Sequence, residues 1–183
     1  MLLYRVFPYL VDASPDQPGG SLYVPRQGAG RIDNPDMYRV HYLSSAPAGA
    51  AAEIFGWRMQ WTPHMLRGVP GLPGSAYALA EFELLETPGI CNLDNAHELV
   101  AHSLRPSTVI TRELRITQSW ARGIYEELRW NGVGWWSYYD ARWLSCGIWD
   151  SHLLTLLDVR VLSMDDLSLI TAARTLRRAI RTK

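Results

Sequence analysis

Hydrophobic and polar residues alternate along several short segments of the chain, and elsewhere apolar residues recur with the spacing of a helix face. Strict alternation indicates a half-buried strand, whereas apolar residues spaced about three to four positions apart indicate an amphipathic helix. These patterns predict strands over residues 2–7, 38–43, 76–85, 90–93, 132–139 and 155–162. They predict helices over residues 46 to 57–61, 95–103, 111–129 and 165–181.

The predicted strands and helices are interspersed without the regular repeat of a parallel α/β fold. Residues 12–20 and 62–75 are rich in Gly and Pro and predict surface loops, the second long enough to fold over a pocket. A chain of 183 residues can enclose one good hydrophobic core. We therefore predict a single compact α+β domain over residues 1–183, with small packed β-sheets flanked by helices.

The composition indicates an ordinary globular protein, because 48% of the residues are hydrophobic and 20% are charged. Eighteen basic and eighteen acidic residues cancel, so we expect no general attraction to nucleic acid or to an anionic membrane. The chain has neither a signal-peptide pattern at its start nor an apolar run long enough for a membrane span. These features predict a cytoplasmic protein with no direct nucleic-acid binding.

The segment His97-Glu-Leu-Val-Ala-His102 resembles a zinc-binding helix, but its histidines are five positions apart. The motif of zinc proteases spaces them by one residue less, which places both imidazoles on one helix face. Cys91 and Cys146 also lack the spacing of metal ligands. The sequence therefore predicts no metal site.

Three polar side chains stand out between residues 28 and 57. Arg31 follows Gly28 and Gly30, whose missing side chains let the backbone bend sharply and let a ligand come close. Tyr42 lies on a predicted strand, and Glu53 lies among alanines and large apolar residues of a predicted helix. A buried carboxylate needs a partner, water or a ligand. The alternative is that Glu53 is an ordinary exposed glutamate of a helix surface.

Four short motifs, in order, resemble those of the RES-domain family, which is named for its Arg, Glu and Ser. After an opening strand that contains Tyr4-Arg5-Val6, the chain reads Gly30-Arg31-x-x-Asn34-Pro35, Tyr42-Leu43-Ser44, Ala51-Ala52-Glu53 and Gly132-Val133-x-x-Trp136-Ser137. The step of eleven residues from Tyr42 to Glu53 agrees with the family pattern, and Ser137 corresponds to the serine. One departure is that the family's usual Gly-Gly-Arg-Trp-Asn reads Gly-Ala-Gly-Arg-Ile-Asp-Asn here.

This resemblance implies a fold related to ADP-ribosyltransferases, with NAD⁺ as substrate and no metal. It also implies the toxin of a bacterial toxin–antitoxin pair, whose partner is an Xre-type helix-turn-helix antitoxin. Proteins of this family deplete NAD⁺ by hydrolysis or phosphorolysis, or in some cases ADP-ribosylate a protein. The implied reaction is cleavage of the bond between nicotinamide and ribose.

The candidate residues suit this chemistry. Cleavage passes through an oxocarbenium-like state, which a carboxylate near the anomeric carbon stabilises more than the ground state. We assign this role to Glu53, and expect Arg31 to hold the pyrophosphate or ribose. Tyr42 would stack on nicotinamide or bond to ribose, and Ser137 would bond to the nicotinamide amide or orient Glu53. Nicotinamide is already a cationic leaving group, so neither a metal nor a strong general acid is required.

Two other functions are compatible with the sequence. One is a transferase that moves ADP-ribose to a protein acceptor. The other is a non-catalytic binding module that uses the eight tryptophans or the basic last helix. For Tyr42 and Ser137, purely structural roles in the core and in a strand are the alternative to roles in a site.

Overall fold

The computed structural model of the protein describes residues 1–85 and 89–181 and has a mixed α+β architecture, which confirms the predicted fold class. The strands are β1 (Leu2–Tyr9), β2 (His41–Ser44), β3 (Gln60–Trp61), β4 (Ala76–Leu84), β5 (Ile90–Asn92), β6 (Gly132–Trp136), β7 (Leu144–Ile148), β8 (Leu154–Val161) and β9 (Ala179–Ile180). The α-helices are α1 (Pro47–Phe55), α2 (Ala96–Ala101), α3 (Pro106–Val109), α4 (Leu114–Glu126) and α5 (Leu167–Thr175). Short 3-10 helices cover Pro63–Leu66 and Ser151–Leu153.

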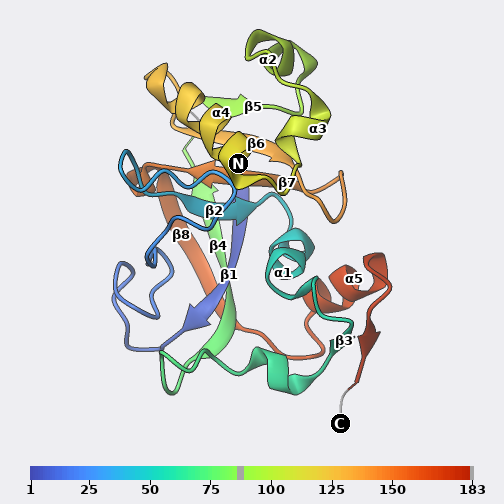
Figure 1. Cartoon of the computed structure of the whole chain (residues 1–183). Coiled ribbons are helices and arrows are strands. Elements are labelled where there is room, and N and C mark those ends of the chain that lie inside the picture. The colour runs from blue at the N-terminus through green and yellow to red at the C-terminus, as the bar shows by residue number, and fades with distance from the viewer. Residues whose placement is uncertain (86–88, 182–183) are drawn as a thin grey trace.

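Seven strands form one sheet in the order β5-β6-β7-β2-β1-β4-β8, and β3 pairs with β9 separately. β1 pairs with β4 over its whole length, and β2 pairs with β7 over its four residues. In the described part of the chain, β1 and β2 meet at a single residue pair, Tyr4 and Ser44. The sheet therefore has two halves whose strands run in crossing directions (Figure 1). This division agrees with the small packed sheets predicted from the sequence.

Helix α1 packs close to the junction between the two halves of the sheet. Pro47 stands in its first turn, where the missing N–H costs nothing. The side chains of Ala51 and Ala52 are fully buried, and their small size lets the helix lie close to β1 and α5. The helix is thus held firmly on one side, while Glu53 lies on its exposed side.

Further apolar clusters cover the rest of the sheet. One packs α4 against β5 and β6, with Trp120, Ile124 and Val133 among its members. The other joins β1, β4 and β7 through side chains such as Phe7 and Phe82. Among the described residues, no helix is long and apolar enough to cross a membrane.

The boundaries of several elements differ from the prediction. The helix predicted over residues 165–181 ends at Thr175, because Arg177 adopts a left-handed φ of 53°. The backbone N–H groups of Arg177 and Arg178 then bond to the carbonyls of Arg174 and Ala173, which closes a Schellman motif before β9 begins.

Three further predicted elements are shorter in the structure. The helix predicted over 111–129 begins at Leu114, and the strand predicted over 132–139 ends at Trp136. The strand predicted over 38–43 begins at His41, although Tyr38 and Val40 are buried before it. Strand β7 has no counterpart in the prediction.

Replacing Phe82 on β4 by Ala tests the packing at the centre of the sheet. The side chain is 0% exposed, so Phe82→Ala should lower the free energy of unfolding by about 3–5 kcal/mol. Denaturant unfolding followed by circular dichroism measures this change. The neighbouring exposed position supplies a control, since Glu83→Ala should alter stability by no more than about 0.5 kcal/mol. A loss of similar size in both variants would contradict the packing described here.

Candidate active site

A pocket of about 1020 Å³ lies where the two halves of the sheet meet. Its wall includes β1 from one half, Trp135 and Ser145 from the other, and Glu53 of α1. The loop predicted over residues 62–75 contributes Val69 and Leu72 to the wall. Small-molecule sites usually measure about 300–1000 Å³, so this pocket is at the upper end of that range.

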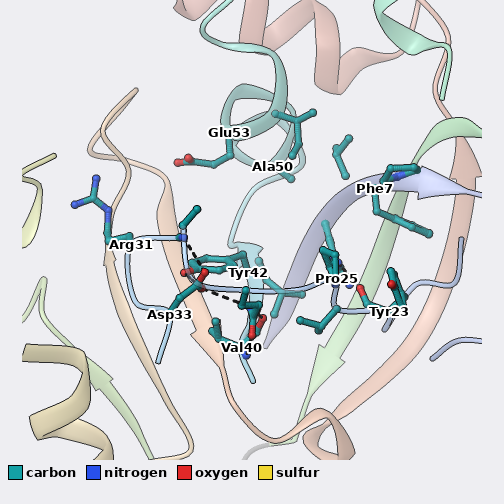
Figure 2. Close-up of a pocket in the computed structure, with 18 of the residues that line it drawn as sticks. Phe7, Tyr23, Pro25, Arg31, Asp33, Val40, Tyr42, Ala50 and Glu53 are labelled. Atoms are coloured by element: carbon teal, nitrogen blue, oxygen red, sulfur yellow. Dashed lines mark hydrogen bonds between the residues drawn. The ribbon is translucent and has the colours of Figure 1, made fainter. Parts of the chain in front are cut away.

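Glu53 projects from α1 into this pocket, and two serine hydroxyls hold its carboxylate (Figure 2). Ser137 donates to Oε1 of Glu53 at 2.7 Å, and Ser145 donates to the same oxygen at 3.3 Å. The backbone N–H of Tyr139 donates to the hydroxyl of Ser137 at 3.2 Å, which directs the Ser137 proton towards Glu53. Among the described residues, none donates a hydrogen bond to Oε2, so this oxygen can act on a ligand.

The exposure of Glu53 combines the two readings of the sequence. Its side chain is exposed, as expected of an ordinary surface glutamate, but it opens into the pocket. Ser137 and Ser145 are only 3% and 5% exposed, so the groups that orient the carboxylate are shielded from bulk water.

Arg31 lines the same pocket, and one edge of its guanidinium is fixed by the backbone. The Nη1 group donates to the carbonyl oxygens of Val109 and Thr111, each at 2.8 Å. Burial lowers the pKa of Arg31, while the nearby carboxylate of Glu53 opposes this shift. The two charged groups are therefore close enough to influence each other, and Figure 2 shows both on the same side of the pocket.

Tyr42 also lines the pocket, but its hydroxyl is already occupied. The hydroxyl donates to Oδ1 of Asp33 at 2.6 Å and accepts the backbone N–H of Ile32 at 3.0 Å. Burial and the bond to Asp33 raise the pKa of Tyr42 well above its usual value, so the phenol stays protonated and keeps donating. What Tyr42 can offer a ligand is the face of its ring.

Asp33 is a residue that sequence reasoning missed, and it organises the loop that carries Arg31. Its Oδ2 accepts the backbone N–H groups of Gly28 and Gly30, both at 2.7 Å, and only 4% of the residue is exposed. An aspartate that closes a glycine-containing turn in this way is a common local signal, and its position three residues after Gly30 could have indicated this role.

The two glycines of this loop have different physical reasons. Gly28 has a φ of +137°, which favours a residue without a side chain, as the predicted sharp bend requires. At Gly30, a Cβ atom would meet the hydroxyl of Tyr42 and would lie 2.6 Å from Oδ1 of Asp33. The close approach at Gly30 is therefore to side chains of the protein itself, and not to a ligand as the sequence suggested.

The structure brings Arg31, Tyr42 and Glu53 together on the wall of one pocket, while Ser137 lies behind Glu53 and is not part of that wall. Arg112 and Tyr138 line the pocket as well, and sequence reasoning did not single them out. The Arg112 guanidinium stacks over the Tyr138 ring, 5.3 Å from its centre. None of the described members of this site belongs to a metal-ligating cluster.

Asp33→Asn should destabilise the protein by about 1–3 kcal/mol, because the amide nitrogen would face a backbone N–H or the Tyr42 hydroxyl and leave one donor without an acceptor. Thermal and denaturant unfolding measure this loss. Asp36→Asn, at an exposed position in the same segment, should stay within about 0.5 kcal/mol of the unchanged protein. Equal stability of the two variants would contradict the role given to Asp33.

Comparison with known proteins adds a likeness in fold. No protein-family model and no curated protein sequence matches the chain. A chain in the crystal structure of the M. tuberculosis MbcT-MbcA toxin-antitoxin complex is similar, with a TM-score of 0.59 and 15% sequence identity. The match covers 88% of this chain and 84% of that chain. The protein therefore has the α+β fold found in this structural neighbour, over nearly its whole length.

Proposed function

We propose that the protein cleaves the nicotinamide–ribose bond of NAD⁺ and acts as the toxin of a toxin–antitoxin pair. The observation that carries this proposal is the Glu53 carboxylate, which two buried serine hydroxyls orient within the pocket that also holds Arg31. The resemblance to the RES-domain family supports it. So does the fold shared with a chain of a toxin-antitoxin complex.

Glu53 is proposed as the catalytic carboxylate. The serines occupy Oε1, so Oε2 is the oxygen directed at the anomeric carbon or at the ribose hydroxyls. As the bond to nicotinamide breaks, positive charge develops on the ribose ring. A fixed negative charge beside the ring stabilises that state more than the substrate, which lowers the barrier. Ser137 and Ser145 act as positioning residues, because they contact Glu53 rather than the substrate.

Arg31 is proposed to bind the pyrophosphate. Its Nη1 is tied to two carbonyls, and the remaining N–H groups can donate side by side to phosphate oxygens. Tyr42, whose hydroxyl is engaged with Asp33, would present its ring face to nicotinamide. The apolar part of the wall, which includes Phe7, Tyr23 and Pro25 in Figure 2, would then pack against the adenine.

The acceptor of ADP-ribose separates hydrolysis, phosphorolysis and protein transfer. Purified protein mixed with NAD⁺, with and without phosphate, should release nicotinamide when no target protein is present. Ribose-phosphate product that forms only with phosphate identifies a phosphorylase. Release that requires added protein and labels it would instead favour the transferase, and no loss of NAD⁺ would favour a binding module.

The proposed partner is an antitoxin protein, of the Xre type that the resemblance implies. Expression of the chain alone should arrest bacterial growth, and co-expression of the adjacent gene product should relieve the arrest. Normal growth during expression of folded protein would contradict the toxin role.

Glu53→Gln should lower the rate of nicotinamide release by at least about 100-fold, because the neutral amide keeps the shape but not the charge of the carboxylate. Chromatographic assay of nicotinamide measures the rate, and circular dichroism checks the fold. Glu83→Gln, an exposed change on β4, is the matched control and should leave the rate unchanged. Near-normal turnover by a folded Glu53→Gln variant would refute the assignment.

Arg31→Lys should weaken NAD⁺ binding by about tenfold or more, since a lysine cannot bond to two carbonyls and a phosphate with the geometry of a guanidinium. Titration calorimetry, under conditions where turnover is blocked by Glu53→Gln in both proteins, gives the affinity. Arg39→Lys, at an exposed position outside the pocket, should bind as the parent does. Unchanged affinity in Arg31→Lys would remove Arg31 from the proposed site.

A further inference from the structure

A second cluster of reactive side chains lies beside β5 and α2, at the end of the molecule that carries the label α2 in Figure 1. Cys91 of β5, Glu98 of α2 and His102, which follows α2, offer ligating atoms that all lie within 4.8 Å of one another. Cys91 is fully buried, and the His102 side chain is only 9% exposed. None of the three belongs to the wall of the pocket, so this cluster is separate from the proposed NAD⁺ site.

The hydrogen bonds of His102 require an additional positive charge. Its Nε2 lies 2.9 Å from a carboxylate oxygen of Glu127, and its Nδ1 lies 2.7 Å from the backbone carbonyl oxygen of Glu98. A neutral imidazole carries only one N–H and cannot donate to both oxygens. Either a second proton occupies the ring, or a metal ion takes the place of one proton.

The geometry favours Nδ1 as the metal-binding atom. The contact from Nε2 to Glu127 then has the form common around metal sites, in which a carboxylate accepts the other ring N–H and fixes the imidazole. Around Nδ1 lie the sulfur of Cys91 at 3.9 Å and a carboxylate oxygen of Glu98 at 4.0 Å. Ligands of a tetrahedral zinc ion are about 3.3–3.8 Å apart for ordinary bond lengths, so a small contraction would close the set.

Two unsatisfied groups at this place point to a cation. Oε2 of Glu98 is buried and has no hydrogen-bond partner among the described residues, which is costly for a carboxylate oxygen. Burial and the carboxylates of Glu98 and Glu127 raise the pKa of Cys91 to about 12, so the surroundings of the sulfur are negative. A divalent ion would pair with the free oxygen and the sulfur together.

We propose that Cys91, Glu98 and His102 form a zinc site. The ion would be bound by Sγ of Cys91, a carboxylate oxygen of Glu98 and Nδ1 of His102, a combination of sulfur, oxygen and nitrogen ligands that zinc accepts. Binding releases two protons, one from the thiol of Cys91 and one from Nδ1 of His102. The ion would tie β5 to α2. His97 takes no part, because its side chain is 83% exposed.

The test uses the full chain, dialysed against zinc chloride and then against metal-free buffer, with the retained zinc measured by elemental analysis. We expect one zinc ion per chain, lost in Cys91→Ser and in His102→Gln. His97→Gln is the matched control, since it removes an imidazole from the same segment but should retain the ion. No retained zinc in the unchanged protein, or equal loss in His97→Gln, would overturn the proposal and leave His102 as the cation of an ion pair.

A second measurement does not depend on the folding of a variant. Cobalt(II) added to the unchanged protein should give the near-ultraviolet absorption of a cobalt–thiolate bond, and X-ray absorption of the zinc form should detect one sulfur ligand. A coordination shell of nitrogen and oxygen alone would overturn the proposal. Both readouts are independent of NAD⁺ cleavage, so failure of the zinc site and failure of the proposed function can be told apart.

Discussion

The hydrogen bond from Ser137 to Glu53 connects the chain just beyond β6 to the helix that packs against β1. It therefore bridges the two halves of the sheet, whose strands meet directly at one residue pair in the described chain. The carboxylate is fixed relative to both halves because α1 is anchored through buried alanines and Ser137 is itself buried. The shape of the pocket and the direction of its charged group depend on this one interaction.

Sequence patterns were sufficient for the elements whose environment is simple. The alternation along β1 and β4 reflects two sheet faces that both contact apolar clusters, and it gave nearly correct boundaries. Strand β7 escaped prediction because Ser145 and Gly147 interrupt its apolar run. Their reasons lie elsewhere in the chain: Ser145 bonds to Glu53, and the side chains of Ile32 and Val40 fill the space of a Cβ at Gly147.

The candidate site shows the same limit. Arg31, Tyr42 and Glu53 could be proposed from motifs, because each stands in a recognisable local pattern. Asp33 and Ser145 could not be weighed in the same way, since their importance comes from which partners the fold brings to them. The Glu53–Ser145 contact joins residues 92 positions apart, and no local pattern encodes such a distance.

The knot of hydrogen bonds around Asp33 has a thermodynamic consequence for ligand capture. Asp33 immobilises the loop at Gly28 and Gly30, and the carbonyls of Val109 and Thr111 immobilise the tip of Arg31. Rotamer and backbone freedom at this cation are therefore surrendered when the chain folds, before any dinucleotide arrives. A ligand that meets Arg31 loses little affinity to ordering the receptor, and association resembles the docking of two rigid bodies.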